Sequence, residues 1–227
     1  MIPRPTDPFV FAIDVSDIAR ADELAVKLAP HAGMLKVGLE LFWAHGPEAV
    51  RTVGRHGPVF VDSKLHDIPT TVERASMNVA RLGVAMFNVH ALGGEAMMRA
   101  ALRGAERGAE SIGRPRPLVV AVTVLSSQAG EDLASPASLA YEAKVAGLDG
   151  VVVSGDDVTD VRTACGEGFC LVVPGIRPSG SNGDDQVRVL TPLAAQEKGA
   201  DYLVVGRPVT EAPDPAAAAR ALALELR

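Results

Sequence analysis

The chain carries the sequence FVDSKLHDIPTT from Phe60 to Thr71. Its first residues continue a short apolar run of β-formers, Val59–Val61, and this run predicts a buried strand that leads into a polar loop. Side chains two residues apart on a strand share one face, at about 6.5 to 7 Å along the chain. Asp62 and Lys64 are therefore expected side by side at the C-terminal end of this strand.

The second half of the segment predicts the start of a helix. The proline after Ile68 biases that residue toward an extended conformation, and Thr70 with Glu73 matches a capping box. The helix is therefore expected to begin at about Thr71, and Asp67 falls between the strand and the helix. An acid, a base and a second acid are thus held between two rigid elements. Taken alone, a D-x-K-x-x-D pattern is equally compatible with a solvated charged loop.

Similar apolar runs recur along the chain, each followed by a polar or alanine-rich segment of helical length. Continuous Val, Ile and Leu without alternation is typical of strands buried on both faces of a parallel sheet. The predicted strands are Phe9–Ile13, Met34–Val37, Val59–Val61, Val84–Val89, Leu118–Val124, Gly150–Val153, Cys170–Val173 and Tyr202–Val205. Eight such units in 227 residues favour an α/β fold of the (β/α)8 TIM-barrel type, built as one domain over residues 1–227. No G-x-G-x-x-G follows the first strand, which disfavours a dinucleotide-binding fold.

Helix candidates lie between these strands. They are Ile18–Leu28, Leu39–Val53, Val72–Leu82, Ala96–Arg107, Pro136–Ala146, Val158–Ala164, Leu193–Lys198 and Pro215–Leu226. Trp43 is expected to pack within the second of them.

The longest irregular stretch, residues 176–191, is rich in Gly and Ser and follows the seventh strand. It is predicted to be a lid, because long loops in compact folds are usually functional and this one lies on the face where barrels build their active sites.

Composition restricts the class of function. The chain is 48% hydrophobic and 22% charged, as is usual for a soluble globular protein. Its net charge of -6 and its aromatic share of 4% disfavour binding to nucleic acid. The cysteines, Cys165 and Cys170, match neither a redox nor a zinc spacing and are expected to be packing residues in a reducing compartment. Because no run of about 18 apolar residues occurs, the prediction is a cytoplasmic protein without membrane contact.

Polar residues gather at the predicted C-terminal ends of the strands, where barrel enzymes place their chemistry. These residues are Asp14, Lys36, Asp62, Lys64, His90 and Thr123. Any single one is more often a capping or barrel-filling side chain, but together they predict a pocket lined by charges of both signs. The remaining histidines, His31, His45 and His56, fall on presumed helices or loops and are expected at the surface. Neither His66 nor His90 has a His or Cys partner at ligand spacing, so no metal site is predicted.

The last two strands end in motifs suited to phosphate. Pro174-Gly-Ile-Arg177 follows the seventh strand, and Gly206-Arg207-Pro208 follows the eighth. Glycine lets a backbone N–H approach a phosphate oxygen closely, and an arginine can hold the same group through a charge-assisted hydrogen bond. The loops after strands seven and eight are the usual phosphate site of this barrel type. The pattern is specific for phosphate and leaves the rest of the ligand undefined.

These motifs closely resemble those of the orotidine 5'-phosphate decarboxylase family. The shared motifs are Asp62-x-Lys64-x-x-Asp67-Ile-Pro-x-Thr71, Lys36-Val-Gly-Leu-Glu-Leu-Phe, Val122-Thr123-Val-Leu, Pro174-Gly-Ile-Arg177, Asp184-Asp-Gln186 and Val-Gly206-Arg207. The resemblance covers nearly the whole chain, from the first strand to the eighth, and its most specific part is D-x-K-x-x-D-I-P. It implies the decarboxylation of orotidine 5'-phosphate to UMP in pyrimidine biosynthesis, without a metal or an organic cofactor.

The resemblance also implies roles for individual residues. Lys64 would protonate C6 of the substrate beside Asp62, and Asp67 would enter the site from the second subunit of a homodimer. The implied substrate-binding residues are Asp14 and Lys36 for the ribose, Thr123 for the pyrimidine, Gln186, Gly206 and Arg207 for the phosphate, Arg177 above it, and Ile68 and Thr70 from the loop of Asp67. Counting three residues on from Asp67 selects Thr70 over Thr71.

Two alternatives remain compatible with the residues. A sugar-phosphate enzyme on the same barrel, such as a 3-keto-gulonate 6-phosphate decarboxylase or a hexulose-phosphate synthase, resembles the chain around D-x-K-x-x-D but uses Mg²⁺, for which Glu40 could supply a ligand. The Ile68-Pro69 pair and Gln186 fit the nucleotide enzyme better. A non-catalytic barrel that binds a nucleotide is the other alternative, and the intact acid, base and acid series argues against it.

Overall fold

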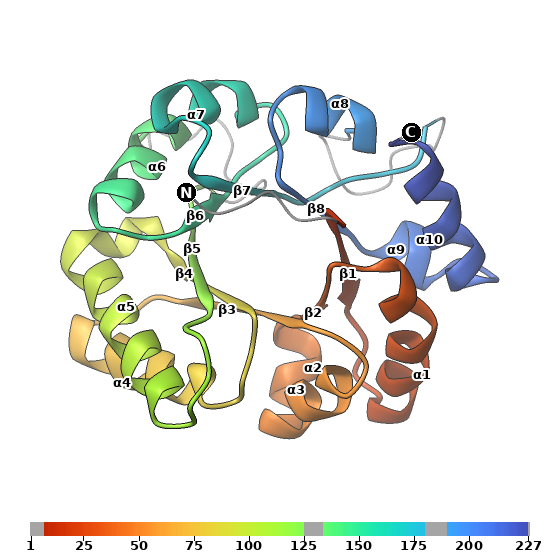
Figure 1. Ribbon diagram of the computed structural model, residues 1–227, viewed down its shortest axis with the longest axis horizontal. Helices are drawn as coiled ribbons and strands as arrows, with labels where there is room; N and C mark the ends of the chain where they lie inside the picture. The colour runs from red at the N-terminus through yellow and green to blue at the C-terminus, as the bar shows by residue number, and fades with distance from the viewer. Residues whose placement is uncertain (1–6, 125–133, 180–189, 227) are drawn as a thin grey trace.

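The computed structural model describes residues 7–124, 134–179 and 190–226. Within them, eight parallel strands close into a barrel, in chain order and with β8 paired to β1 (Figure 1). The strands are β1 (Phe9–Ile13), β2 (Met34–Val37), β3 (Val59–Leu65), β4 (Met86–His90), β5 (Leu118–Val122), β6 (Gly150–Val152), β7 (Cys170–Val173) and β8 (Tyr202–Val205). The predicted (β/α)8 TIM barrel is confirmed, and β1, β2, β7 and β8 have the predicted bounds.

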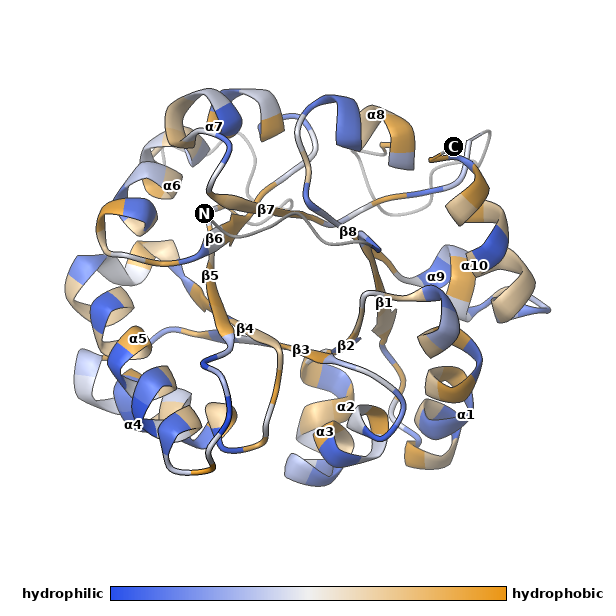
Figure 2. Cartoon of the chain, in the orientation of Figure 1, coloured by the Kyte–Doolittle hydropathy of each residue, from blue (hydrophilic) through white to orange (hydrophobic). Residues whose placement is uncertain are grey.

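Alternate side chains of the strands face two apolar layers. In β1, Phe9, Phe11 and Ile13 belong to the large core that also contains helix residues such as Leu24. The intervening Val10 and Ala12 belong to a smaller cluster whose buried members all come from strands, and this cluster fills the barrel interior. Figure 2 shows the strands as mostly hydrophobic and the outer helices as mixed. Burial on both faces explains why these strands lack polar alternation in the sequence.

Helices form the outer ring (Figure 1). Those in the described residues are α1 (Ile18–Leu28), α2 (Leu39–His45), α3 (Pro47–Gly54), α4 (Pro69–Ala80), α5 (Gly94–Glu110), α6 (Pro136–Val145), α7 (Val158–Cys165), α8 (Pro192–Glu197), α9 (Arg207–Thr210) and α10 (Pro215–Leu224), with short 3-10 helices η1 (Ala29–His31) and η2 (Ala91–Gly93). The single helix predicted over 39–53 is in fact two, α2 and α3. It breaks at Gly46, whose φ of +58° is unfavourable for other residues, and Pro47 then starts the next helix.

The start of α4 differs from the prediction. The helix begins at Pro69, and the residue that caps it is Ile68, which makes no side-chain capping bond. The predicted capping box of Thr70 and Glu73 is therefore wrong. Proline fits the first position of a helix because its fixed φ is already helical and its missing N–H would have no partner there. Glu73 instead accepts hydrogen bonds from Arg103 and Arg107 of α5.

Trp43 does not pack into the helix layer as expected. Its relative exposure is 81%, whereas Leu41, two residues earlier on α2, is fully buried. Residues two apart on a helix point in nearly opposite directions, so a helix that buries Leu41 turns Trp43 toward solvent. The prediction for Trp43 is wrong, and the exposed indole requires another explanation.

The two cysteines are packing residues, as predicted. Cys165 and Cys170 are both buried and form no disulfide. Burial raises the pKa of each thiol, so both behave as small apolar side chains.

In the part of the chain that the structure describes, no helix is long and apolar enough to cross a membrane.

Candidate active site

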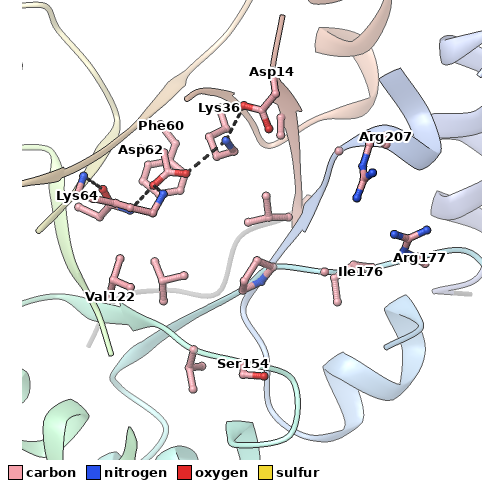
Figure 3. A pocket seen from close by; sticks show the side chains of 18 of the residues that line it. Asp14, Lys36, Phe60, Asp62, Lys64, Val122, Ser154, Ile176, Arg177 and Arg207 are labelled. Carbon is pink, nitrogen blue, oxygen red and sulfur yellow. Dashed lines mark hydrogen bonds and ion pairs between the residues drawn. The ribbon is translucent and has the colours of Figure 1, made fainter. Parts of the chain in front are cut away.

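A cavity of about 310 Å³ opens among the C-terminal ends of the strands (Figure 3). Its charged lining residues are Asp14, Lys36, Asp62, Lys64, Arg177 and Arg207. Gly175, Gly206 and Asn88 add polar groups to the lining, and Phe60 and Val122 contribute apolar surface. The volume is suited to a small molecule. Four of the six predicted strand-end residues, Asp14, Lys36, Asp62 and Lys64, thus line one cavity, whereas His90 and Thr123 are not among its described lining residues.

Four of the charged side chains form an alternating row. Lys36 Nζ lies 2.9 Å from Asp14 Oδ1 and 3.3 Å from Asp62 Oδ2. Lys64 Nζ lies 2.6 Å from Asp62 Oδ1 and donates a hydrogen bond to it. Figure 3 shows the row Asp14, Lys36, Asp62 and Lys64 along one side of the cavity. Asp62 therefore lies between two ammonium groups and contacts both.

The row fixes the protonation state of Asp62. Its burial by itself raises the pKa of the carboxyl group, because the charged form loses solvent. The charges of Lys36 and Lys64, together with hydrogen bonds from Lys64 and Asn88, outweigh burial and bring the pKa below its ordinary value of 3.8. Asp62 is therefore an anion at neutral pH and forms an ion pair with each of the two lysines.

Asn88 is a site residue that the sequence reasoning did not identify. It lies on β4, is 1% exposed, and lines the cavity. Its side-chain nitrogen donates to Asp62 Oδ1 at 2.7 Å, and its side-chain oxygen accepts from the backbone N–H of Lys64 at 2.7 Å. A single amide thus holds both members of the acid and base pair. The available signal was a polar residue inside the otherwise apolar run of this strand.

The backbone of β3 is irregular where it carries the pair. Its pairing with β4 shifts register between Val61 and Leu65, as in a β-bulge. Lys64 has a φ of +48° and is the sole non-glycine residue with positive φ in the described ranges 7–124, 134–179 and 190–226. Such a conformation is costly for a lysine and recurs at functional sites. Asp62 and Lys64 do meet, as predicted, but through a bulge that redirects Lys64 and not through regular alternation.

The opposite side of the cavity holds two arginines. Arg177 follows β7 and Arg207 begins α9 after β8, and Figure 3 shows both at the end away from Lys64. Arg177 is 6% exposed, whereas Arg207 is exposed. The backbone N–H of Arg177 donates to the carbonyl of Leu190 at 3.1 Å, which ties the segment after β7 to the start of α8. Gly175 and Gly206 line the same end, as the phosphate motif predicts.

Several predicted site residues lie away from this cavity. Thr123 is 1% exposed, and its hydroxyl donates to the carbonyl of Val152 at 3.2 Å. Asp67, Ile68 and Thr70 are exposed in the segment between β3 and the first turn of α4. None of these four residues belongs to the described lining of the cavity. The prediction for Gln186 concerns a position outside the described residues.

Two histidines stack beside the acid and base pair. The rings of His66 and His90 lie 5.3 Å apart between centroids. Burial lowers the pKa of His90, and the neighbouring charges of His66 and Lys64 lower it further while Asp62 opposes them. Nδ1 of His90 is buried and has no hydrogen-bond partner in the described part of the chain. His90 is therefore neutral near pH 7, and no group of three or more potential metal ligands surrounds it or any other described residue.

The fold and the cavity define the class of protein. It is a (β/α)8 barrel with an ion-lined, small-molecule pocket at the C-terminal ends of its strands. The model of the orotidine 5'-phosphate decarboxylase / HUMPS family matches residues 7–222. The chain belongs to this family.

Individual relatives agree with the family assignment. The orotidine 5'-phosphate decarboxylase of Moorella thermoacetica is 49% identical over 97% of this chain and 92% of its own length. That of Anaeromyxobacter dehalogenans is also 49% identical, over 98% of this chain and all of its own length. Among solved structures, the orotidine 5'-phosphate decarboxylase of Lactobacillus acidophilus is 35% identical, covers 97% of this chain and 99% of its own, and superimposes with a TM-score of 0.83.

Proposed function

We propose that the chain is a carboxy-lyase that converts orotidine 5'-phosphate to UMP in pyrimidine biosynthesis, with the ammonium group of Lys64 protonating C6. The carrying observation is the Asp62 and Lys64 contact of 2.6 Å inside a strand-end pocket whose far end holds two arginines. Family membership and the names of the relatives support the substrate. We extend the proposal to a reaction that needs neither metal nor organic cofactor, in a cytoplasmic enzyme.

The chemistry of the substrate explains why an ammonium group is needed. Loss of CO2 from C6 of the pyrimidine leaves an electron pair in the plane of the ring, where the π system cannot delocalise it. Stabilisation must therefore be electrostatic and must come from a charge beside C6. The ammonium of Lys64 supplies that charge and then the proton, which bonds to C6 as the carbanion is quenched. Schiff-base chemistry requires a neutral, free amine, whereas Lys64 is paired with the carboxylate of Asp62 at 2.6 Å.

One charge pair does not account for a full enzymatic acceleration. Two unit charges 4 Å apart contribute about 4 kcal/mol at an effective dielectric constant of 20, whereas enzymes lower barriers by about 8 to 23 kcal/mol. The remaining stabilisation requires binding energy from the distant parts of the substrate. The cavity has the layout for this, because Arg177 and Arg207 lie opposite Lys64 while Asp14 and Lys36 lie between, where ribose hydroxyls would bind (Figure 3).

Holding the phosphate and the ribose would press the substrate carboxylate toward Asp62. Because the pKa of Asp62 is lowered, that contact is between two anions in the bound ground state and is relieved when CO2 leaves. Thr123 would reach the pyrimidine only if its hydroxyl exchanged the Val152 carbonyl for the substrate, since the hydroxyl donates to that carbonyl in the free protein. Gln186 would complete the phosphate site from the predicted lid.

The site also calls for a second copy of the chain. Asp67 is exposed and absent from the lining of its own cavity. Within the described residues its carboxylate accepts only the local hydrogen bond from the N–H of Ile68, at 2.6 Å. Large apolar side chains are exposed after β2, β3 and β4. They are Leu39 at 43%, Trp43 at 81%, Ile68 at 67% and Leu92 at 42%. We infer that these residues are covered in a homodimer in which Asp67, Ile68 and Thr70 enter the neighbouring site, which also accounts for Trp43.

Complementation between two inactive variants tests the shared site. Lys64→Ala and Asp67→Ala are purified separately, mixed in equal amounts, and allowed to exchange subunits. If Asp67 serves its neighbour, each mixed dimer contains one intact site, and random exchange restores about a quarter of wild-type activity. If Asp67 serves its own subunit, the mixture stays inactive although the two chains exchange, and the shared-site proposal fails.

The metal-dependent members of the same barrel type are the alternative function. Glu40, the acid considered for Mg²⁺, accepts a hydrogen bond from Ser16 Oγ at 2.6 Å and does not line the cavity. This placement favours the nucleotide reaction. The test follows the ultraviolet absorbance of orotidine 5'-phosphate with purified protein in excess chelator. Decarboxylation under these conditions supports the proposal. Failure with this nucleotide, combined with Mg²⁺-dependent turnover of a keto-sugar phosphate, would transfer the assignment to the alternative.

A further inference from the structure

A second hollow, of about 740 Å³, lies at the opposite end of the barrel from the candidate active site. It is bounded by the C-terminal ends of α3, α4 and α5 and by the starts of β3 and β4, which adjoin in the ring (Figure 1). Its charged lining residues are Arg51, Arg55, Arg81 and Arg114, and no carboxylate is among the described residues that line it. We refer to these four arginines and the hollow between them as the arginine cleft. Such a cluster is unexpected on a chain with a net charge of -6.

The arginines are weakly engaged by the protein itself. Arg51 contacts Glu48 at 3.3 Å and Arg55 contacts Asp22 at 3.6 Å, and each arginine side chain is 63% exposed. Ion pairs of this length and exposure contribute little. Nε of Arg81 donates only to a neutral group, the hydroxyl of Ser111, at 3.2 Å. The side chain of Arg114 makes no hydrogen bond or ion pair within residues 7–124, 134–179 and 190–226, and only its backbone N–H is bonded, to the carbonyl of Ala109 at 3.1 Å. Most of the donor capacity of the cleft is therefore available to a ligand.

Helix dipoles explain only part of this arrangement. A cation near a helix C-terminus is stabilised, and this accounts for Arg55 and Arg81, which cap α3 and α4. The effect does not extend beyond the last turn. Arg114 lies four residues past the end of α5, whose last turn already has Arg107, paired with Glu73 at 3.0 Å. The fourth arginine thus adds charge that the helix end does not need.

The rest of the cleft is apolar. Val59, Leu82 and Val84 line it, and Ile112, 40% exposed, lies at its edge. Arginine forks bind phosphate oxygens in pairs, and several of them suit an anion with more than one phosphate. The volume exceeds that of the candidate active site, which is about 310 Å³. We propose that the arginine cleft is a second ligand site, which binds an oligophosphate: either inorganic pyrophosphate or the oligophosphate group of a nucleotide whose base rests on the apolar residues.

Titration calorimetry with inorganic pyrophosphate and with a nucleoside triphosphate, in phosphate-free buffer, tests this proposal. The double variant Arg81→Ala/Arg114→Ala is expected to weaken binding at this site by about tenfold to a hundredfold, because two charge-assisted contacts are lost. Its decarboxylase activity should equal that of the wild type, which shows that the variant is folded. The matched control is Arg220→Ala, an exposed arginine on α10 outside the cleft.

Hydrogen exchange locates the bound anion independently of the active site. Pyrophosphate should slow amide exchange at residues 55–58, 81–85 and 111–115 in the wild type but not in the double variant. Protection by the triphosphate alone would assign the site to nucleotides, and protection by both would assign it to oligophosphates in general. If neither ligand protects these segments, or if the double variant binds as tightly as Arg220→Ala, the proposal is wrong, whatever the outcome for the decarboxylase activity.

Discussion

Replacing Asp62 with Asn removes one negative charge from between two ammonium groups, with little change in shape. Asp62 contacts Lys64 at 2.6 Å and Lys36 at 3.3 Å, and its side chain is 15% exposed. Removing one partner of a buried ion pair costs about 3 to 5 kcal/mol, because the remaining charge is left without compensation. The side chain of Lys64 is 30% exposed, so solvent offsets part of this cost. We expect the free energy of unfolding to fall by about 3 kcal/mol at neutral pH.

Asp14→Asn is the matched control. It makes the same chemical change and also removes a contact with Lys36, at 2.9 Å, but the Asp14 side chain is 50% exposed. Lys36 is only 9% exposed, but solvent reaches the Asp14 side of the pair and Lys36 keeps its contact with Asp62, so the loss should be smaller, at about 1 kcal/mol. Urea unfolding at one protomer concentration, followed by circular dichroism, measures both variants. Equal losses in the two variants, or a gain of stability for Asp62→Asn, would refute the claim that the buried row of charges depends on Asp62.

The sign of the pH dependence provides a second check on Asp62. Its pKa in the folded protein is below the unfolded value of 3.8, so the folded state binds fewer protons as the pH approaches that value. The stability that it contributes is complete above the unfolded pKa and is lost as the pH falls through the folded pKa. The difference between the wild type and Asp62→Asn should therefore be constant near neutrality and shrink below about pH 4. A difference that grows on acidification would contradict the assignment.

Two further variants test the groups around the pair. Asn88→Ala should reduce kcat by about ten- to a hundredfold with a smaller change in KM, because Asp62 and the backbone of Lys64 lose their common hydrogen-bond partner. Steady-state kinetics measure both constants. An unchanged kcat would show that Asn88 does not position Lys64. The free energy of unfolding of His90→Phe should fall less steeply between pH 7 and pH 5 than that of the wild type. The pKa of His90 in the folded protein lies below its ordinary 6.5, so the stability contributed by the neutral ring is complete above that value and is lost as the pH falls. Urea unfolding across this range checks the second variant, and equal slopes for the wild type and His90→Phe would show that His90 does not resist protonation.

The sequence predicted those parts of the fold in which one physical cause dominates. β1, β2, β7 and β8 have the predicted bounds because each is a continuous apolar run, buried on both faces. β3 is longer than predicted, since its polar half, residues 62–65, stays in the sheet through a bulge. The apolar pattern of residues 39–53 continues from α2 into α3, so it predicts a single helix. The break between the two helices arises from the conformation of Gly46.

The same contrast holds for the site. Asp14, Lys36, Asp62 and Lys64 could be placed together because barrel topology brings strand ends to one mouth. The left-handed backbone of Lys64 and its bond to Asn88 could not be predicted, because both arise from the register shift between β3 and β4. The helical context of Trp43 predicts packing, but the local sequence does not determine which side of α2 faces solvent or a second chain.

The role of Lys64 as the acid that meets the carbanion is the central claim, and Lys64→Ala tests it most directly. The measurement compares kcat with orotidine 5'-phosphate, in excess chelator, with the affinity for UMP, which keeps the phosphate and ribose contacts but has no carboxylate. We predict that turnover is abolished while the dissociation constant for UMP stays within about tenfold of the wild-type value. Lys64 is expected to stabilise the transition state more strongly than it stabilises bound UMP. A Lys64→Ala enzyme with near-normal kcat would contradict the account.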